Sequence, residues 1–389
     1  MKIQYSIMLV GMILLHTYLF AQQKSHPNIQ ELPKTLTVSA GKGFHVQGIA
    51  FDLKKGYAYF SFTTSLLKTD LKGNILGSVE GFTGHLGCIS LNPEDGKLYG
   101  SLEYKNDVIG NSIKEKLNIR SDKNTQTGFY IAIFDPEKIT RKGMQANENE
   151  VMTSVYIKEA VDDHLAKTTN QGVPLQHKYA CSGIDGITFG PDMKTKKQML
   201  YIAYGVYGDT TRTDNDYQVL LCYDTSKWGR YQKPLIANSL HQSGPKRPTH
   251  KYFIYTGSTN YGIQNMTYDP YTNSFFLAVY KGKKRQYPNF PLFMVEANQN
   301  PTSQKLKGFD TTEKKQTLSL AHKGCYDEKS DTWGWNFNLG STGMAAIGDG
   351  YFYFSKSWKK NKKIEMCTIQ LYKWNNGNLK EPFTLIENE

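Results

Sequence analysis

Residues 45 to 59 read HVQGIAFDLKKGYAY, and residues 85 to 99 read HLGCISLNPEDGKLY. The two stretches align without a gap, so that His45 matches His85 and both turns carry a glycine. Each copy has the pattern of a short apolar strand, a polar turn and an aromatic strand. Self-similarity of this kind is typical of repeat architectures. The chain is therefore predicted to repeat one β-unit.

From His45 onward, strand-like runs follow one another in groups of four, and each group opens with a variant of the same phrase. The opening runs are GIAF, CISL, GITF, NMTY and GMAA, and the run QTLSLA, residues 316–321, is expected to close the fourth group. Five groups of four strands predict an all-β fold, a β-propeller with five four-stranded blades around a central channel. The spacing between the opening runs is uneven, so six or seven blades stay open. Residues 36–39 (LTVS) could form one extra strand, and residues 157–167 a short helix.

The first 21 residues have the pattern of a secretory signal peptide. Lys2 precedes an apolar run from Ile7 to Phe20, and Ala21 is a plausible cleavage point. An uncleaved membrane anchor is the alternative, although the run is short for a spanning helix. We expect residues 22–389 to form a single propeller domain that is secreted or periplasmic, with no stable membrane insertion after cleavage.

The formal net charge of +12 favours anionic partners. For an exported chain we expect an acidic glycan rather than nucleic acid, and we expect a monomer. Three of the five cysteines, Cys88, Cys222 and Cys367, lie in apolar strand-like runs and are interpreted as buried thiols. Cys181 and Cys325 could form a disulfide. No cysteine or histidine spacing suggests zinc.

One face of the predicted propeller is expected to carry the function. Antiparallel strands alternate in direction, so the links into each first strand share a face with the links from second to third strands. These links are long and polar, as at residues 104–127 and 162–181, whereas most first-to-second links are tight turns. Long loops on a rigid scaffold are where binding usually resides. The starts of the innermost strands should therefore open into the functional mouth of the channel.

Four residues near this mouth are the candidate catalytic groups: His45, His85, Glu103 and Asp185. Two histidines at equivalent blade positions could act as general base and acid near neutral pH. Alternatively, they form hydrogen bonds between blades. Glu103 could be a catalytic carboxylate or the ion-pair partner of Lys105, and Asp185 a catalytic carboxylate or a turn cap.

Further side chains at the same face are candidate substrate-binding groups: Gln47, Lys105, Arg212, Tyr261, Gln264 and Asn265. Arg212 could clamp a carboxylate with two hydrogen bonds. The nearby Asp209, Asp214 and Asp216 could hold calcium, although acidic turns are common. No other cofactor is predicted, and no residue is assigned as a metal ligand.

Two basic runs, residues 281–285 and 358–363, fall on the same face and are either solvated surface or a cationic rim for an acidic glycan. Trp333, Trp335 and Trp358 could stack on sugar rings.

The HVQG phrase at His45, followed by GHLG at Gly84, resembles the bacterial propeller enzymes that cleave rhamnosyl-glucuronate linkages in plant glycans. These enzymes have been treated both as glycoside hydrolases and as lyases. The resemblance implies that His45 matches the essential histidine of that family. It also implies that Arg212 or the basic loops neutralise a uronate carboxylate. That family is seven-bladed, whereas five blades are counted here.

Five-bladed furanosidases are a second comparison, but they need carboxylates on several innermost strands, and only Asp185 lies at such a position here. The leading hypothesis is an exported enzyme that cleaves acidic, uronate-containing oligo- or polysaccharides by hydrolysis or β-elimination. A non-catalytic glycan- or protein-binding propeller is the first alternative. A small-molecule hydrolase or lactonase with calcium in the channel is the second. Fold alone does not choose between them.

Overall fold

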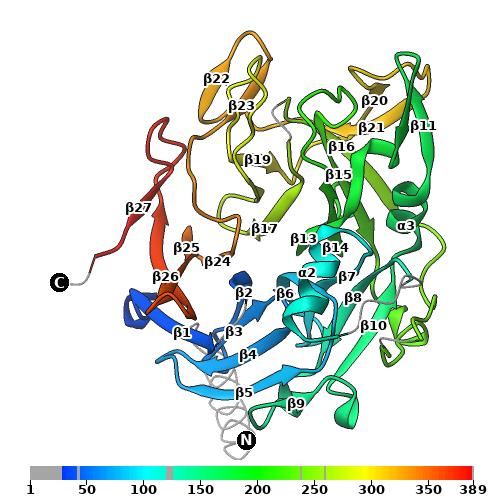
Figure 1. The fold of residues 1–389 in the computed structure, drawn as a ribbon. Helices are drawn as coiled ribbons and strands as arrows, with labels where there is room; N and C mark the ends of the chain where they lie inside the picture. Colours follow the sequence, from blue (N-terminus) through cyan, green and yellow to red (C-terminus); the bar gives the residue numbers. More distant parts are fainter. Residues whose placement is uncertain (1–28, 42–43, 120–125, 237–238, 258–259, 388–389) are drawn as a thin grey trace, which may run out of the picture.

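Five mainly antiparallel sheets are arranged around a common axis in the computed structural model, which describes residues 29–41, 44–119, 126–236, 239–257 and 260–387 (Figure 1). Each innermost strand contacts the next, and the last contacts the first, so the ring is closed. These strands are β2 (Val46–Asp52), β6 (His85–Leu91), β13 (Cys181–Pro191), β17 (Ile263–Asp269) and β24 (Met344–Gly348). The predicted five-bladed β-propeller is confirmed.

The first two blades follow the predicted four-strand order. Blade one continues from β2 through β3 (Tyr57–Phe62), β4 (Ser65–Asp70) and β5 (Ile75–Glu80), and the short β9 (Met144–Gln145) adds to its outer edge in parallel. Blade two continues from β6 through β7 (Leu98–Tyr104), β8 (Gly128–Phe134) and β10 (Met152–Tyr156). Every residue of β7 and β8 is buried, because both faces of these strands pack inside the ring.

Blades three and four depart from the predicted arrangement at their outer edges. Blade three runs from β13 through β14 (Gln198–Val206), β15 (Tyr217–Tyr223) and β16 (His250–Tyr255) to β21 (Lys314–Leu318) and β20 (Thr302–Lys305). Blade four pairs β17, β18 (Ser274–Val279) and β19 (Leu292–Glu296).

The stretch QTLSLA, residues 316–321, is predicted as the outer strand of blade four, and this assignment is wrong. Its first half belongs to β21, which pairs in parallel with β16 of blade three, with Thr317 opposite Phe253. Only its end reaches blade four, where the Ala321 N–H donates to the Met294 carbonyl. The hairpin of β22 (Cys325–Asp327) and β23 (Thr332–Gly334) follows.

Blade five joins the two ends of the described chain. It contains β24, β25 (Tyr351–Lys360), β26 (Ile364–Trp374) and the short β27 (Phe383–Leu385). The extra strand expected at residues 36–39 forms as β1 (Thr35–Gly41) and pairs with β26, with Val38 opposite Cys367 (Figure 1). An N-terminal strand therefore completes the last blade, which leaves less sheet edge exposed.

Short polar side chains tie neighbouring blades together at the axis. The Ser61 hydroxyl on β3 donates to the Gly87 carbonyl on blade two at 2.6 Å. The Ser101 hydroxyl occupies the same position on β7 and donates to the Asp185 carbonyl on blade three, also at 2.6 Å. The apolar core lies between the blades, in clusters that each draw on more than one blade. This packing fixes where each inner strand begins, and so positions the site.

The expected short helix forms as α3 (Lys158–Leu165), while the predicted loop 104–127 also contains α2 (Val108–Lys116), which the Asp107 side chain caps. A small hairpin, β11 (Lys167–Asn170) and β12 (Val173–Gln176), follows α3. The predicted signal peptide, residues 1–21, lies outside the described residues. Among the helices that are described, none is both long and apolar enough to cross a membrane.

The suggested disulfide between Cys181 and Cys325 is wrong. All five cysteines are free thiols. Cys181 is fully buried beside α3, with its Sγ 3.5 Å from the Ala160 carbonyl oxygen, whereas Cys325 lies on the β22–β23 hairpin beside Leu379.

Candidate functional site

Irregularities near the starts of the inner strands place polar side chains at the channel mouth. The pairing register shifts between Val46 and Gly48, between Ile184 and Ile187, and between Ile263 and Asn265. At these shifts some residues have no partner on the neighbouring strand. Among them are Gln47, Asp185 and Gln264, which occupy equivalent positions in blades one, three and four. A β-bulge re-aims the side chain of the extra residue. The Gln264 amide donates to Asp185 Oδ2 at 3.0 Å, linking two of these positions.

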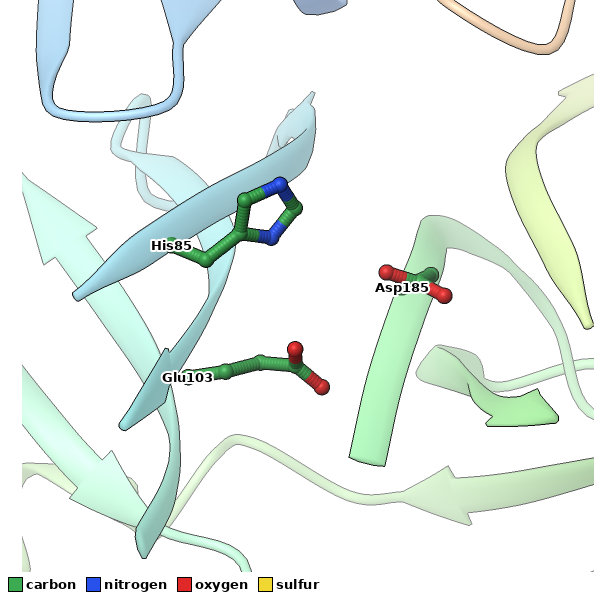
Figure 2. A group of neighbouring side chains, drawn as sticks. All are labelled: His85, Glu103 and Asp185. Carbon is green, nitrogen blue, oxygen red and sulfur yellow. The ribbon is translucent and has the colours of Figure 1, made fainter. Parts of the chain in front are cut away.

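Three of the four candidate catalytic residues converge. His85 begins β6 and lies opposite Glu103 on β7, while Asp185 lies on β13 of the next blade. Each offers one nitrogen or oxygen atom, and these atoms all lie within 4.8 Å of one another. Figure 2 shows His85 and Glu103 extending from adjacent strands toward Asp185. We call these three residues the mouth cluster.

Glu103 is the buried member of the mouth cluster, with 3% of its surface exposed. Its Oε1 accepts the Ile184 N–H at 2.5 Å, and its Oε2 lies 2.8 Å from Lys105 Nζ. Burial raises the pKa of Glu103 to about 7, against the opposing effect of Lys105. Burial disfavours the Lys105 cation, but the carboxylates of Glu103, Asp107 and Asp185 raise its pKa above the usual value. Both Glu103 oxygens are therefore occupied by protein groups.

His85 and Asp185 are only partly buried and retain unused hydrogen-bonding capacity. Burial lowers the pKa of His85 to about 3, and Lys105 and His45 lower it further, so the imidazole is neutral at neutral pH. Burial raises the pKa of Asp185, while Lys105 opposes the change. Within the described part of the chain, the His85 ring forms no hydrogen bond, and Asp185 accepts at its side chain only from Gln264.

His45 lies at the start of the channel on blade one and is exposed. Its Nε2 is 3.1 Å from the Gln47 side-chain nitrogen, which also donates to Thr63 Oγ1 at 3.3 Å. Desolvation by the surrounding protein lowers the pKa of His45, and Lys116 and Lys359 act in the same direction against Glu365. At neutral pH the imidazole is therefore neutral, and its one lone pair, on Nε2, accepts a hydrogen bond from the Gln47 amide.

Blade four contributes an aromatic wall and a structural amide. Tyr261 is half-buried and packs edge-on against Tyr280, with ring centroids 5.8 Å apart. Burial and then the Asp185 carboxylate raise the pKa of Tyr280 to about 12. Asn265 is buried, and its side-chain N–H groups donate to the carbonyls of Gln47 and Ser341. Asn265 therefore joins three blades at the axis.

Tyr280 is a neighbour of the mouth cluster that sequence reasoning missed. The available signal was its place directly after the second strand of blade four, which by strand register is equivalent to the place of Glu103 in blade two.

Arg212 is not part of the mouth cluster. Its Nε and Nη2 donate to the two oxygens of Asp214, and its Nη1 and Nη2 donate to the carbonyls of Gln176 and His177. Four of its five N–H groups are thereby used within the protein. Among the described residues, Asp209, Asp214 and Asp216, which were suggested to hold calcium, do not form a cluster of metal-binding groups. Asp209 caps its own turn through Thr211, and Asp216 pairs with Lys284.

The predicted cationic and aromatic rim is only partly present. Lys284, in the basic run 281–285, is buried and contacts Asp216, Asn215 and the Arg212 carbonyl. Trp335 is fully buried and donates to the Asn378 carbonyl, so it is unavailable to a sugar ring. Trp358 is 44% exposed, and Trp333 stacks on Tyr326 and His322.

No protein-family model matches the chain, and no curated protein matches it in sequence. The resemblance to the rhamnosyl-glucuronate-cleaving enzymes therefore has no support from a family model. The solved structures that match the chain do so at low identity and with low TM-scores. A Bacteroides caccae protein of unknown function is 10% identical over 72% of this chain and 88% of that chain, with a TM-score of 0.29.

The Dos1 propeller is 12% identical, over 88% of this chain and 81% of that chain, with a TM-score of 0.30. PorZ, a surface component of the type-IX secretion system of Porphyromonas gingivalis, is 11% identical. Its match covers 84% of this chain and 32% of that chain, with a TM-score of 0.33. The propeller assignment rests on the strand pairing of this chain itself.

Proposed function

We propose that this propeller cleaves uronate-containing oligo- or polysaccharides at the end of the channel where the inner strands begin. The observation that carries the proposal is the convergence of His85, Glu103 and Asp185, within 4.8 Å, at this mouth. His45 and Gln264 add polar groups from two more blades. Perturbed titratable groups gathered in one place are a recognised mark of functional sites. The net charge of +12 favours an anionic substrate.

The state of Glu103 favours β-elimination over hydrolysis. Glycoside hydrolysis commonly uses two carboxyl groups that both reach the scissile bond. Here Glu103 is 3% exposed, and each of its oxygens already contacts one protein group, Ile184 or Lys105, so it is not placed to protonate a scissile bond. Asp185 is then the one accessible carboxylate of the mouth cluster. Elimination needs no second carboxylate and consumes no water.

Elimination requires two proton transfers, one from the sugar to a base and one from an acid to the leaving oxygen. Bound substrate displaces the Gln47 amide from His45 Nε2, and the neutral imidazole then takes the proton from the carbon beside the uronate carboxyl group. The electron pair of that C–H bond forms a C=C bond, and the C–O bond to the leaving sugar breaks. The leaving oxygen takes a proton from the Tyr261 hydroxyl, which donates to no residue in the described part of the chain. Tyr261 later recovers a proton from the His45 imidazolium through solvent.

The test is incubation of the full chain with a panel of uronate polysaccharides, with ultraviolet absorbance and reducing ends both measured. Elimination gives equal amounts of unsaturated product and new reducing ends. His45→Ala is expected to reduce the rate by roughly 100-fold or more, in the range of a lost general base. The control is Glu94→Ala, which removes an exposed side chain from the turn between β6 and β7, at the other end of blade two, and should leave the rate unchanged.

Two results would overturn the proposal. Reducing ends without unsaturated product would assign hydrolysis. Glycan binding on an array without cleavage of any bound glycan would make the chain a binding propeller.

A further inference from the structure

We infer that the mouth cluster, His85, Glu103 and Asp185, binds one divalent transition-metal cation of the Zn²⁺ or Mn²⁺ class. The inference extends the proposed function, because this cation would also neutralise the carboxylate of a bound uronate.

The spacing of the three residues fits a single cation. Their offered atoms lie within 4.8 Å of one another. A point among three atoms at such separations lies at most about 2.8 Å from each of them. Zn²⁺ binds histidine nitrogen and carboxylate oxygen at about 2.0–2.2 Å. Each side chain therefore has to move by less than about 1 Å to complete the contacts, a change within reach of side-chain rotation.

The donor types select the class of metal. One imidazole nitrogen and two carboxylate oxygens suit Zn²⁺ or Mn²⁺, whereas Ca²⁺ and Mg²⁺ prefer all-oxygen sites. The His85 ring forms no hydrogen bond to any described residue, and Asp185 Oδ1 accepts none, so both have lone pairs free for a ligand. Three protein ligands leave open positions, the arrangement found in catalytic rather than structural zinc sites.

A second layer of contacts holds the ligands in place. Gln264 donates to Asp185 Oδ2, the Ile184 N–H donates to Glu103 Oε1, and Lys105 Nζ lies 2.8 Å from Glu103 Oε2. In known metal sites, groups that are not ligands themselves orient the ligands through contacts of this kind. Lys105 does not exclude the metal, because each carboxylate oxygen carries a second lone pair. The three ligands also come from β-strands of two packed blades, which makes the site rigid.

The charged side chains around the mouth cluster favour the binding of a cation. The carboxylates of Glu103 and Asp107 lie 2.8 and 3.7 Å from Lys105 Nζ, and Asp185 also interacts with this ammonium group. Three carboxylates thus surround one ammonium group. The two basic residues expected to neutralise a uronate, Arg212 and Lys284, are paired with Asp214 and Asp216. An anionic sugar that reaches the mouth cluster would therefore meet more carboxylates than ammonium groups there unless a metal ion were bound, while Lys116 and Lys359 lie closer to His45.

The test measures metal binding separately from glycan cleavage. The full chain is stripped with a chelator and titrated with ZnCl₂, MnCl₂ and CaCl₂ by calorimetry, and its melting temperature is recorded with each metal. The expected result is one Zn²⁺ or Mn²⁺ per chain with a raised melting temperature, and at least tenfold weaker Ca²⁺ binding. His85→Ala and Asp185→Asn should each weaken binding at least tenfold. His322→Ala, with an exposed histidine removed, should bind as the wild type does.

Each outcome decides between the two proposals. Absence of stoichiometric binding, or binding unchanged in both His85→Ala and Asp185→Asn, would overturn the metal site. Circular dichroism of the stripped variants shows that any loss reflects the ligand rather than unfolding. Metal binding without cleavage of any uronate glycan would leave the site standing and remove the proposed function. Full cleavage by the stripped protein would leave the proposed function standing and remove only the role of the metal ion in it.

Discussion

The Arg212 guanidinium donates hydrogen bonds to both oxygens of the Asp214 carboxylate, each at 2.7 Å. The pair is buried, and Arg212 also holds the carbonyls of Gln176 and His177. The backbone from His177 to Ala180 is strained, since His177, Tyr179 and Ala180 all have positive φ angles, of 64°, 56° and 53°. Arg212 thus anchors the segment that leads into β13, the strand carrying Asp185.

Arg212→Ala is expected to lower the free energy of unfolding by roughly 3 kcal/mol, because it leaves the Asp214 carboxylate buried without its partner. Chemical denaturation measures the change. Arg285→Ala is the control, because Arg285 is exposed and should change stability by no more than about 0.5 kcal/mol. Unchanged stability of Arg212→Ala, together with a raised KM for a uronate glycan, would instead make Arg212 a substrate contact.

The five blades could be predicted because each repeats the same local pattern. HVQG and HLGC mark inner strands in the sequence, and the serines of YFSF and YGSL lie at one equivalent position. In the structure these serines, Ser61 and Ser101, form the same hydrogen bond to the next blade. Local periodicity and the repeated contact agree, so the architecture follows from residues close together in the chain.

Which strands pair with one another, and which charged side chains form ion pairs, could not be predicted in the same way. Residues 316–318 have the pattern of a strand, but only the packing of blades three and four determines that β21 pairs with β16. Likewise, Arg212 and Lys284 occur in polar loops, and nothing local indicates that each is paired with an aspartate. The mouth cluster could be predicted only in part. Its residues were predicted from their places at strand ends, but the 4.8 Å convergence depends on two blades packing together.

Gly48→Ala tests the close contact between blades one and two. A Cβ atom at Gly48 would lie 2.8 Å from the backbone nitrogen of Ile89 and 2.9 Å from Cα of Cys88. The backbone of an inner strand cannot easily move away, so we expect a loss of roughly 1–3 kcal/mol in the free energy of unfolding. Gly229→Ala is the matched control, because nothing lies within 4 Å of its added Cβ. Equal stabilities of the two variants would contradict this packing.

Reducing agents are expected to leave the melting temperature unchanged, because all five cysteines are free thiols. Burial raises the pKa of the Cys181 thiol, which keeps it protonated and unreactive in the folded protein. Thiol titration should therefore find five reactive groups in denaturant, and Cys181 should react only after unfolding. A melting temperature that falls on reduction would show that a disulfide forms after all.

His164 should make the stability of the protein depend on pH between about 4 and 6.5. The side chain is buried at the end of α3, with Nδ1 2.9 Å from the Cys181 carbonyl oxygen and its ring beside Phe129. Burial lowers its pKa to about 4, and the nearby His177 and Lys105 also lower it, while the Cys181 carbonyl and Asp107 act in the opposite direction. In the unfolded chain the pKa is about 6.5.

The sign of the effect follows from proton uptake. Between these two pKa values the unfolded chain binds a proton that the folded protein does not, so acid favours unfolding. The contribution of neutral His164 is complete above pH 6.5, falls as the pH drops, and levels off below about pH 4, for a total of roughly 3 kcal/mol. Denaturant unfolding at several pH values should show this slope in the wild type and in the exposed control His322→Gln. His164→Gln keeps an N–H donor for the Cys181 carbonyl but cannot titrate, so its unfolding free energy should vary less with pH by that amount. Parallel pH profiles for the wild type and His164→Gln would show that the folded protein accepts a proton at His164 as readily as the unfolded chain does.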